Sequence, residues 1–292
     1  MVYSIVITYN GATWVDKCFK SLINSNIIDH HIIAIDNGST DDTLEILSKN
    51  YPTVKIIETE SNLGFGKANN IGMRIALEEG ADYVFLLNQD AWVKNDTISK
   101  LIDFADRNPE YSILSPMHYF NEQILDSKFE KYFLTGTDNF RCIKDVKFVN
   151  AALWLVKTSD LFKFGLFNES FNHYGEDSEF CRRLIYHKRK IGILKNAVGY
   201  HERSQRTIVF NNEILKRDSN IFFLMGLIRT EYQFVFGLYN IFSFLIIGNK
   251  FINRKTGFGF VKRFNVLIMS LKTYIKNRNK HFIYNNTNVP LK

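Results

Sequence analysis

The sequence predicts an α/β protein in which a mostly parallel β-sheet is flanked by helices and followed by a helical C-terminal extension. Short β-rich runs alternate with helix-like runs over the first ninety residues, and this order is typical of a parallel sheet with right-handed crossovers. Each β-rich run ends in polar residues or glycine. A hydrophobic content of 46% with 23% charged residues indicates a globular chain and excludes a disordered one.

The first ninety residues contain four β-rich runs separated by three helix-like runs. Trp14, Cys18 and Leu22 recur near helical spacing in the first helix-like run, and Ile71 and Ile75 share one face of the third. The second begins with Ser, Thr and Asp residues, which favour helix N-termini. The expected strands are 4–10, 31–39, 54–62 and 82–90, and the expected helices are 11–25, 39–50 and 66–80.

The order of elements changes after residue 90. A helix is expected to lead directly into a strand, followed by an irregular polar region and then by an apolar run that returns to the sheet. A later helix has acidic residues at its start and basic residues toward its end, as the helix dipole favours. The helix and the strand are expected within 96–114, the irregular region at 117–146, the apolar run at 146–158 and the later helix at 174–190. A strand at 191–204, which contains His201, is expected to follow.

The basic charge of the chain is confined to its C-terminal part. The net charge is +7, but no acidic residue follows Glu231, so residues 1–231 hold 27 basic and 30 acidic residues. An uncharged run of 16 residues, 232–247, opens the basic tail, and it is shorter than the roughly 20 residues that cross a bilayer. We therefore expect a domain at 1–206 and a helical basic segment at 207–292, whose apolar run docks on an anionic membrane surface or on protein.

The cysteines and the N-terminus indicate a cytosolic protein. Cys18, Cys142 and Cys181 are an odd number without paired spacing, which predicts reduced thiols rather than a disulfide framework or a zinc knuckle. The sequence opens directly on a β-rich run, without a basic leader or a small-residue cleavage site. A secretory signal is therefore not expected.

Polar side chains stand at the ends of the first four expected strands. Because the carboxyl ends of parallel strands meet at one edge of the sheet, a single ligand crevice is expected to collect them. Asp36 directly follows an apolar run and is suited to accept a ligand N–H, although residues of such Asx-rich turns also cap helices. The strand-end residues are Thr8, Tyr9, Asn10, Asp36, Asn37, Asn62, Asn88, Gln89 and Asp90.

Three further features each allow two interpretations. The stretch NLGFGKANNIG, residues 62–72, is either a phosphate cradle or a flexible turn that enters a helix. Glu176 and Asp177 begin a predicted helix, where they either complement its dipole or take a proton from a hydroxyl nucleophile. His201 is either an ordinary polar histidine or, if Asp90 lies nearby, a metal ligand.

The ordered set of motifs resembles that of family 2 glycosyltransferases, which have the GT-A (Rossmann-like) fold. It comprises IVITYN, IDNGSTDDT, NLGFGKANNIG, LLNQD, NAALWLVKTSDLFKFGLFNESFNHYGEDSEFCRRL and HERS, over residues 3–206. The resemblance is to bacterial rhamnosyltransferase-like enzymes of surface polysaccharide synthesis. It implies inverting transfer of a sugar from a nucleotide-diphosphate donor, dTDP-rhamnose or a UDP-sugar, to a hydroxyl of a saccharide or lipid-linked acceptor.

The resemblance also implies roles for individual residues. Asp177 matches the catalytic base with Glu176 beside it, and Trp154 is expected near the acceptor. Asp90 matches the metal-binding end of the family's D-x-D motif and His201 a later metal position, which implies Mg²⁺ or Mn²⁺. The residues matched to the nucleotide are Thr8, Tyr9, Asn10, Asp36, Asn62, Lys67, Asn70 and Asn88, with Asp36 reading a pyrimidine N–H.

Asn88 departs from the family pattern, because the fuller D-x-D motif has an acid at this position. An amide brings no charge, so either the protein holds the metal less tightly and relies on the diphosphate oxygens, or Asn88 contacts the nucleotide instead.

The resulting prediction is a cytoplasmic glycosyltransferase, peripheral on the inner face of the plasma membrane. One alternative is a nucleic-acid-binding protein with a basic aromatic tail, but it leaves Asp36, Asp90 and Asp177 unexplained, and nucleic acid is not expected as a partner. The other is a nucleotide-sugar binder that has lost catalysis, which the retained Glu176 and Asp177 disfavour.

Overall fold

The computed structural model describes residues 1–140, 142–169, 171, 174–202 and 268. The elements are β1 (Val2–Thr8), α1 (Val15–Ile23), β2 (His30–Asp36), α2 (Thr43–Asn50), β3 (Lys55–Glu58), α3 (Phe65–Glu78), β4 (Tyr83–Asn88), β5 (Ala91–Val93), α4 (Thr97–Arg107), β6 (Tyr111–Tyr119), α5 (Ser127–Thr135), β7 (Thr137–Phe140), β8 (Ile143–Asp145), β9 (Leu153–Lys157), α6 (Thr158–Phe164), α7 (Glu176–Tyr186) and β10 (Lys190–His201).

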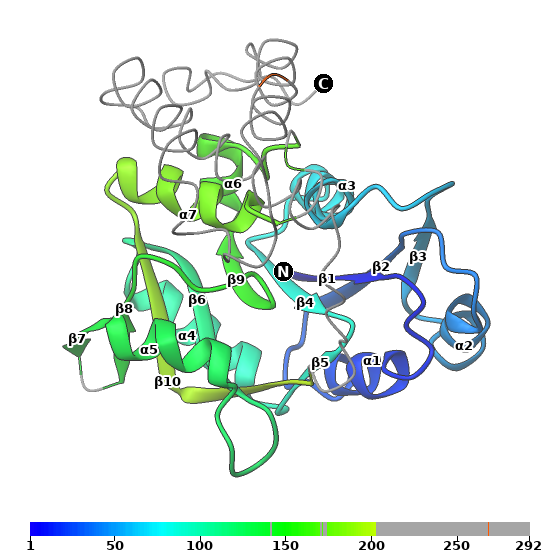
Figure 1. Ribbon diagram of the computed structural model, residues 1–292, viewed down its shortest axis with the longest axis horizontal. Coiled ribbons are helices and arrows are strands. Elements are labelled where there is room, and N and C mark those ends of the chain that lie inside the picture. Colours follow the sequence, from blue (N-terminus) through cyan, green and yellow to red (C-terminus); the bar gives the residue numbers. More distant parts are fainter. Residues whose placement is uncertain (141, 170, 172–173, 203–267, 269–292) are drawn as a thin grey trace.

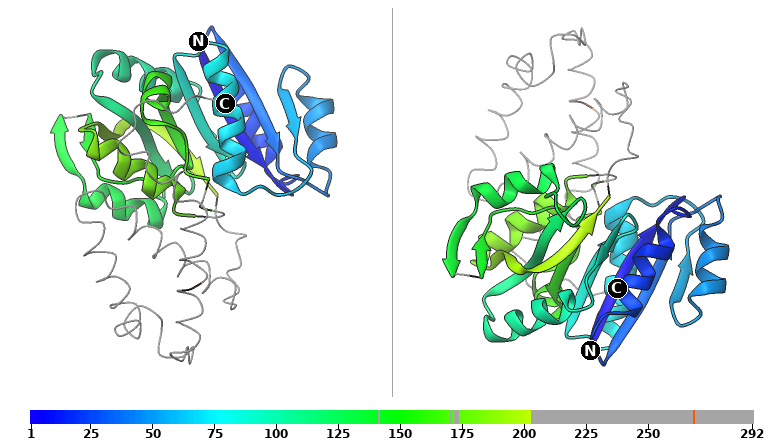
Figure 2. Two further views of the ribbon diagram at one scale, coloured as in Figure 1. Left: turned by 90° about the horizontal axis from the view of Figure 1, so that it is seen from above. Right: turned by 90° about the horizontal axis from the view of Figure 1, so that it is seen from below.

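One sheet runs through the described part of the chain, with helices on both of its faces (Figures 1 and 2). Its strand order is β3-β2-β1-β4-β9-β6-β10-β8-β7, and β5 pairs with β10 off this path. Strands β3, β2, β1 and β4 are mutually parallel, β10 is parallel to β6, and β9 runs antiparallel between β4 and β6. The predicted α/β fold with a mostly parallel sheet is confirmed.

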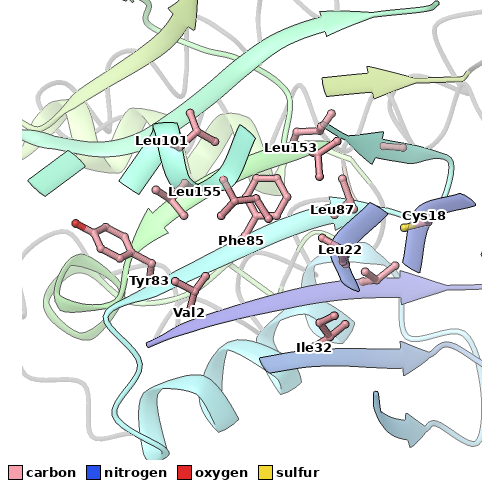
Figure 3. Packing of buried hydrophobic residues seen from close by; sticks show 14 of the residues in the cluster. Val2, Cys18, Leu22, Ile32, Tyr83, Phe85, Leu87, Leu101, Leu153 and Leu155 are labelled. Atoms are coloured by element: carbon pink, nitrogen blue, oxygen red, sulfur yellow. The ribbon is translucent and has the colours of Figure 1, made fainter. Parts of the chain in front are cut away.

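The first face of the sheet packs against α1, α2 and α4. Leucine and phenylalanine side chains of β4 and β9, such as Phe85 and Leu155, meet Leu22 of α1 and Leu101 of α4 (Figure 3). All four side chains are buried. Their transfer out of water is the main force that fixes this layer, at about 25 cal/mol per Å² of apolar surface.

The opposite face packs against α3, α6 and α7, which lie together on one side of the sheet (Figure 1). Gly72 allows α3 to approach β1 closely, since a Cβ at this position would lie 2.7 Å from Ile5 Cγ2. Phe180 of α7 and Trp154 of β9 stack with a centroid distance of 6.3 Å. This layer brings the start of α7 over the same sheet that carries the polar strand ends.

The prediction that residues 117–146 are irregular is wrong in part, because they contain regular elements. Asp126 is the N-cap of α5, and its Oδ1 accepts hydrogen bonds from the backbone N–H groups of Lys128 and Phe129. Phe129 is then buried against the second face of the sheet. The polar composition of 117–146 concealed a short amphipathic helix because only one face of it is apolar.

The C-terminal extension predicted for 207–292, with its division from the domain at 1–206, lies outside the described residues apart from Ile268. In the part of the chain that the structure describes, no helix combines the length and the apolar character needed to cross a membrane.

Candidate active site

The carboxyl ends of β1 and β2 are joined by a buried hydrogen bond between side chains. Thr8 and Asp36 are direct partners in the parallel register, and Thr8 Oγ1 donates to Asp36 Oδ1 at 2.8 Å. Asp36 also accepts from the backbone N–H of Ser39 at 2.8 Å and from the Ser39 hydroxyl. A carboxylate offers about four acceptor positions, so Asp36 shapes the turn and retains acceptor capacity. Its role toward a pyrimidine stays a prediction.

The chain after β1 is held by the loop that follows β4. Gln89 accepts from the backbone N–H of Tyr9 at 2.8 Å and donates to the Tyr9 carbonyl at 3.1 Å. Asn10 has a left-handed backbone with φ 47°, and its Oδ1 accepts from the Thr40 N–H at 2.9 Å. The Tyr9 side chain stays exposed, so an aromatic ring stands at the carboxyl edge of the sheet.

The glycine-rich stretch begins against β2. The amide of Asn37 donates to Asn62 Oδ1 at 2.9 Å, and the same oxygen accepts from the Gly64 N–H at 2.9 Å. Lys67 lies half-buried in the first turn of α3. The structure thus brings Asn62 to the edge where Thr8 and Asp36 lie, and the role of Lys67 toward the nucleotide stays a prediction.

Asn70, which was predicted to contact the nucleotide, is buried between α3 and the segment before α7. This side chain is 1% exposed. Its Nδ2 donates to the Phe167 carbonyl and to Glu169 Oε1, each at 3.0 Å, and its Oδ1 accepts from the Phe167 N–H at 3.0 Å. Because both amide hydrogens are used, Asn70 serves the segment before α7 rather than the strand ends.

The end of β4 meets the end of β10. Asp90 Oδ1 lies 3.2 Å from His201 Nε2, and both side chains are buried. The Asn88 amide nitrogen lies 3.5 Å from the same His201 nitrogen. The structure therefore gathers Asn88, Asp90 and His201, as the prediction of a shared site requires.

Two buried residues that the sequence did not point to continue this cluster. Asp126 Oδ2 lies 3.7 Å from His201 Nδ1, and His118 of β6 completes a group with Asp126 and His201 whose potential ligand atoms all lie within 4.8 Å of one another. His118 Nε2 lies 2.8 Å from the Ser115 hydroxyl. The only sequence signal was the Asx residue before a short helix, and it does not indicate proximity to a residue 75 positions later.

Glu176 and Asp177 form the first turn of α7, after Gly175 in a left-handed conformation with φ 97°. Burial raises the pKa of Glu176 to about 8, and the nearby Asp177 carboxylate adds to this shift. Burial also raises the pKa of Asp177 to about 6, opposed by hydrogen bonds from the backbone of Ser178 and Ala151. At neutral pH Glu176 is mostly protonated, whereas Asp177 is mostly ionised.

Trp154, which was predicted to lie near the acceptor, is a core residue in this structure. Its side chain is 0% exposed and packs against Phe167 and Phe180 under α7. Trp154 supports the layer on which Glu176 and Asp177 rest.

Comparison with known sequences identifies the family. The family described as Glycosyl transferase family 2 matches residues 4–164, more than half of the chain.

The chain belongs to glycosyl transferase family 2.

The family 2 relatives are bacterial enzymes that the chain matches over part of their length. It is 33% identical to the chondroitin synthase of Escherichia coli over 98 residues, which is 32% of this chain and 14% of that protein. It is 29% identical to the dTDP-rhamnosyl transferase RfbF of Shigella flexneri over 116 residues, 40% of this chain and 38% of that protein. The match covers less than two thirds of each of these relatives.

Solved structures support the GT-A fold for this family 2 chain. Residues 1–349 of TarS from S. aureus superpose with a TM-score of 0.62 at 18% identity, over 94% of this chain and 80% of that one. GalNAc-T7, solved with UDP, GalNAc and Mn²⁺, gives a TM-score of 0.64 at 12% identity, over 97% of this chain and 58% of that one. At such identities the likeness concerns the fold.

The Glu176→Gln variant should be more stable than the wild type at high pH. The folded-state pKa of about 8 exceeds the ordinary 4.5. The contribution of this carboxyl to stability is therefore complete below the ordinary value and is lost as the pH rises through the folded-state value. Since glutamine cannot ionise, we expect the variant to gain on the order of 2 kcal/mol relative to the wild type by pH ~9.

Urea unfolding of both proteins at pH ~5 and pH ~9 measures this difference. Glu60→Gln, at an exposed position, is the control and should leave the pH dependence unchanged. Parallel stability curves for Glu176→Gln and the wild type would contradict the assignment.

Proposed function

We propose that this glycosyltransferase acts with inversion, moving a sugar from a nucleotide-diphosphate donor to a hydroxyl group of a saccharide or lipid-linked acceptor in cell-surface polysaccharide synthesis. The observation that carries the proposal is the orientation and the raised pKa of the Asp177 carboxyl at the start of α7. This carboxyl is oriented by two backbone N–H groups, and its pKa is raised to about 6. A base works best when its pKa lies near the operating pH.

In this mechanism Asp177 takes the proton of the acceptor hydroxyl as the acceptor oxygen attacks the anomeric carbon. The bond between that carbon and the diphosphate oxygen breaks on the opposite face, so one displacement inverts the configuration without an enzyme nucleophile. Glu176 remains protonated at neutral pH and adds no second negative charge beside the base. The two carboxyls thus have different protonation states because their environments differ.

The cluster at the ends of β4 and β10 fits a divalent cation such as Mg²⁺ or Mn²⁺. Asp90 and His201 would hold it, because they present a carboxylate oxygen and an imidazole nitrogen 3.2 Å apart. Asp126, at the other ring nitrogen of His201, suits the role of a carboxylate that orients a ligating histidine. When bound, the cation supplies neutralisation of the charge that develops on the diphosphate. Asn88 adds no charge to this set.

The donor is proposed to be a UDP-sugar or dTDP-rhamnose. The relatives include rhamnosyl transferases, and TarS has been solved with UDP and with UDP-GlcNAc. Thr8, Tyr9, Asn10, Asp36, Asn62 and Lys67 would line the nucleotide side. Thermal-shift measurements with UDP-, dTDP- and GDP-sugars would identify the nucleobase of the donor, because a bound ligand raises apparent stability.

The family assignment favours this function over its two alternatives. Nucleic-acid binding was suggested by the basic tail, which lies outside the described residues. A binder without catalysis would not need a carboxyl with a pKa near neutrality at the start of α7.

Asp177→Asn should abolish sugar transfer while nucleotide binding survives. An amide has almost the same shape but cannot take a proton, and loss of a general base typically costs about 10²–10⁴-fold in rate. Turnover of the donor found in the thermal-shift screen and the affinity for its nucleoside diphosphate measure the two effects. Wild-type turnover in this variant would refute Asp177 as the base.

Asp90→Ala should weaken metal-dependent nucleotide binding. Removal of the carboxylate leaves His201 as the remaining charged or ionisable ligand of the proposed pair, and we expect Mn²⁺ affinity to fall about 10- to 100-fold. Mn²⁺ titration followed by electron paramagnetic resonance measures this without turnover, and Asp96→Ala, at a surface position, is the control. An unchanged Mn²⁺ affinity would count against the metal site.

The basic tail, residues 232–292, should bind anionic membranes. Its ten basic residues lie beside an uncharged run, and each basic residue near an anionic surface contributes about 1 kcal/mol. Flotation with vesicles containing phosphatidylglycerol should carry the full-length protein upward and leave a 1–206 truncation behind. Equal recovery of both at the bottom of the gradient would exclude membrane docking by the tail.

A further inference from the structure

The segment between α6 and α7 is tied to α7 by a buried arginine. Arg183 donates from Nη1 to the Phe164 carbonyl at 2.6 Å and from Nη2 to the Leu166 carbonyl at 2.7 Å. The same guanidinium pairs with Glu179 at 2.7 Å, and both side chains are buried. Removal of either partner would leave a buried charge unpaired, which is strongly destabilising. Phe164 and Leu166 are therefore joined directly to α7.

The same segment is tied from its other side to α3. The three hydrogen bonds of Asn70 hold the backbone of Phe167 and the carboxylate of Glu169. Arg74, one helical turn further on, pairs with Glu169 Oε1 at 2.7 Å. Asn70 and Arg74, on one face of α3, thus bind Phe167 and Glu169, which lie eight and six residues before Gly175.

The first turn of α3 also touches the pair of carboxyls. A Cβ added at Gly66 would lie 3.3 Å from Glu176 Cγ and 3.5 Å from the Phe167 side chain. The Phe65 and Phe167 rings lie 6.0 Å apart. Helix α3 therefore lies directly against the start of α7, and it also binds Phe167 and Glu169 in the chain before α7.

Helix α3 continues without interruption from the turn at Asn62 and Gly64. Its first turn carries Lys67, and its second carries Asn70. The rigidity of the helix links the edge of the sheet to the segment before α7. Tyr174 and Gly175 both have left-handed backbones, with φ 65° and 97°, so the chain bends immediately before α7 begins.

We propose that Asn70 is a positioning residue that sets the place of the Glu176–Asp177 pair relative to the nucleotide side of the site. It acts through the backbone of Phe167 and through Glu169, and it does not touch the donor. The inference rests on the proposed role of Asp177 as the base. A misplacement of about 1 Å can cost on the order of 100-fold in rate, so loss of this tie affects turnover more than nucleotide affinity.

Asn69 is a matched control for Asn70. Both asparagines are 1% exposed, but the Asn69 amide donates to the Phe65 carbonyl of its own helix at 3.0 Å. Asn70→Ala is expected to lower kcat by about 10- to 100-fold with the Kd for UDP changed by less than about twofold. Asn69→Ala is expected to change neither by more than about threefold, because its bond stays within α3.

The measurements are the Kd for UDP by calorimetry, and kcat and KM from release of nucleoside diphosphate with UDP-GlcNAc, UDP-glucose or dTDP-rhamnose, whichever supports turnover. Glu169→Gln covers the case in which Asn70→Ala does not fold. It keeps an acceptor for Asn70 but removes the charge that Arg74 pairs with, and we expect a smaller fall in kcat, again without loss of UDP affinity.

Two results would overturn the positioning role. One is an equal fall in kcat for Asn69→Ala and Asn70→Ala, which would indicate a general effect on α3. The other is a rise in the Kd for UDP that accounts for the whole loss, which would make Asn70 a nucleotide ligand. Asp177→Asn, measured in parallel, separates the two hypotheses, because normal turnover in that variant refutes the base assignment itself.

Discussion

The candidate site depends on the register of three parallel strands. Thr8 pairs with Asp36 across β1 and β2, and Ile7 pairs with Asn88 across β1 and β4. These pairings bring the three strands to an end at one level, where the backbone turns away and polar side chains follow. A shift of one residue in β4 would turn Asn88 to the other face of the sheet. The buried side chains of β4 oppose such a shift, because Phe85 and Leu87 pack on one face of the sheet and Leu86 on the other, and each would have to exchange one packed layer for the other.

Several polar groups at this edge are hydrogen-bonded to one another, and Thr8, Asp36 and Asn37 among them are buried. The Thr8 hydroxyl donates a hydrogen bond to the Asp36 carboxylate, and the Asn37 amide donates one to the Asn62 side-chain oxygen. A buried polar group without a partner costs about 1–3 kcal/mol, whereas each bond made contributes only about 1 kcal/mol net. The network therefore adds little stability in itself but penalises other arrangements, so it keeps the edge in one conformation before a ligand arrives.

Much of the fold and part of the candidate site could be predicted from the sequence. The alternation of strands and helices is a local pattern, and so is the position of Asp90 at the end of an apolar run. The predicted strands left the grouping of Asp90 with His201 open, and it was implied only by the resemblance to family 2 glycosyltransferases. Asp126 was not predicted because it lies in a polar region, at the start of a short helix, and nothing local indicates that this helix begins beside His201. The burial of Trp154 and Asn70 could not be predicted, because motif position does not reveal whether a side chain is exposed at a site or packed in the core.

The two hydrogen bonds between Gln89 and the backbone of Tyr9 restrict the size of the residue at position 11. A Cβ at Gly11 would overlap the Gln89 carboxamide. The side chain at 89 thus fills the space that any side chain at 11 would need. In an alignment of homologues, these two positions should therefore covary: a larger residue at 11 should accompany a shorter one at 89. Such a pair would be a signature of how the first loop is anchored, readable without any structure.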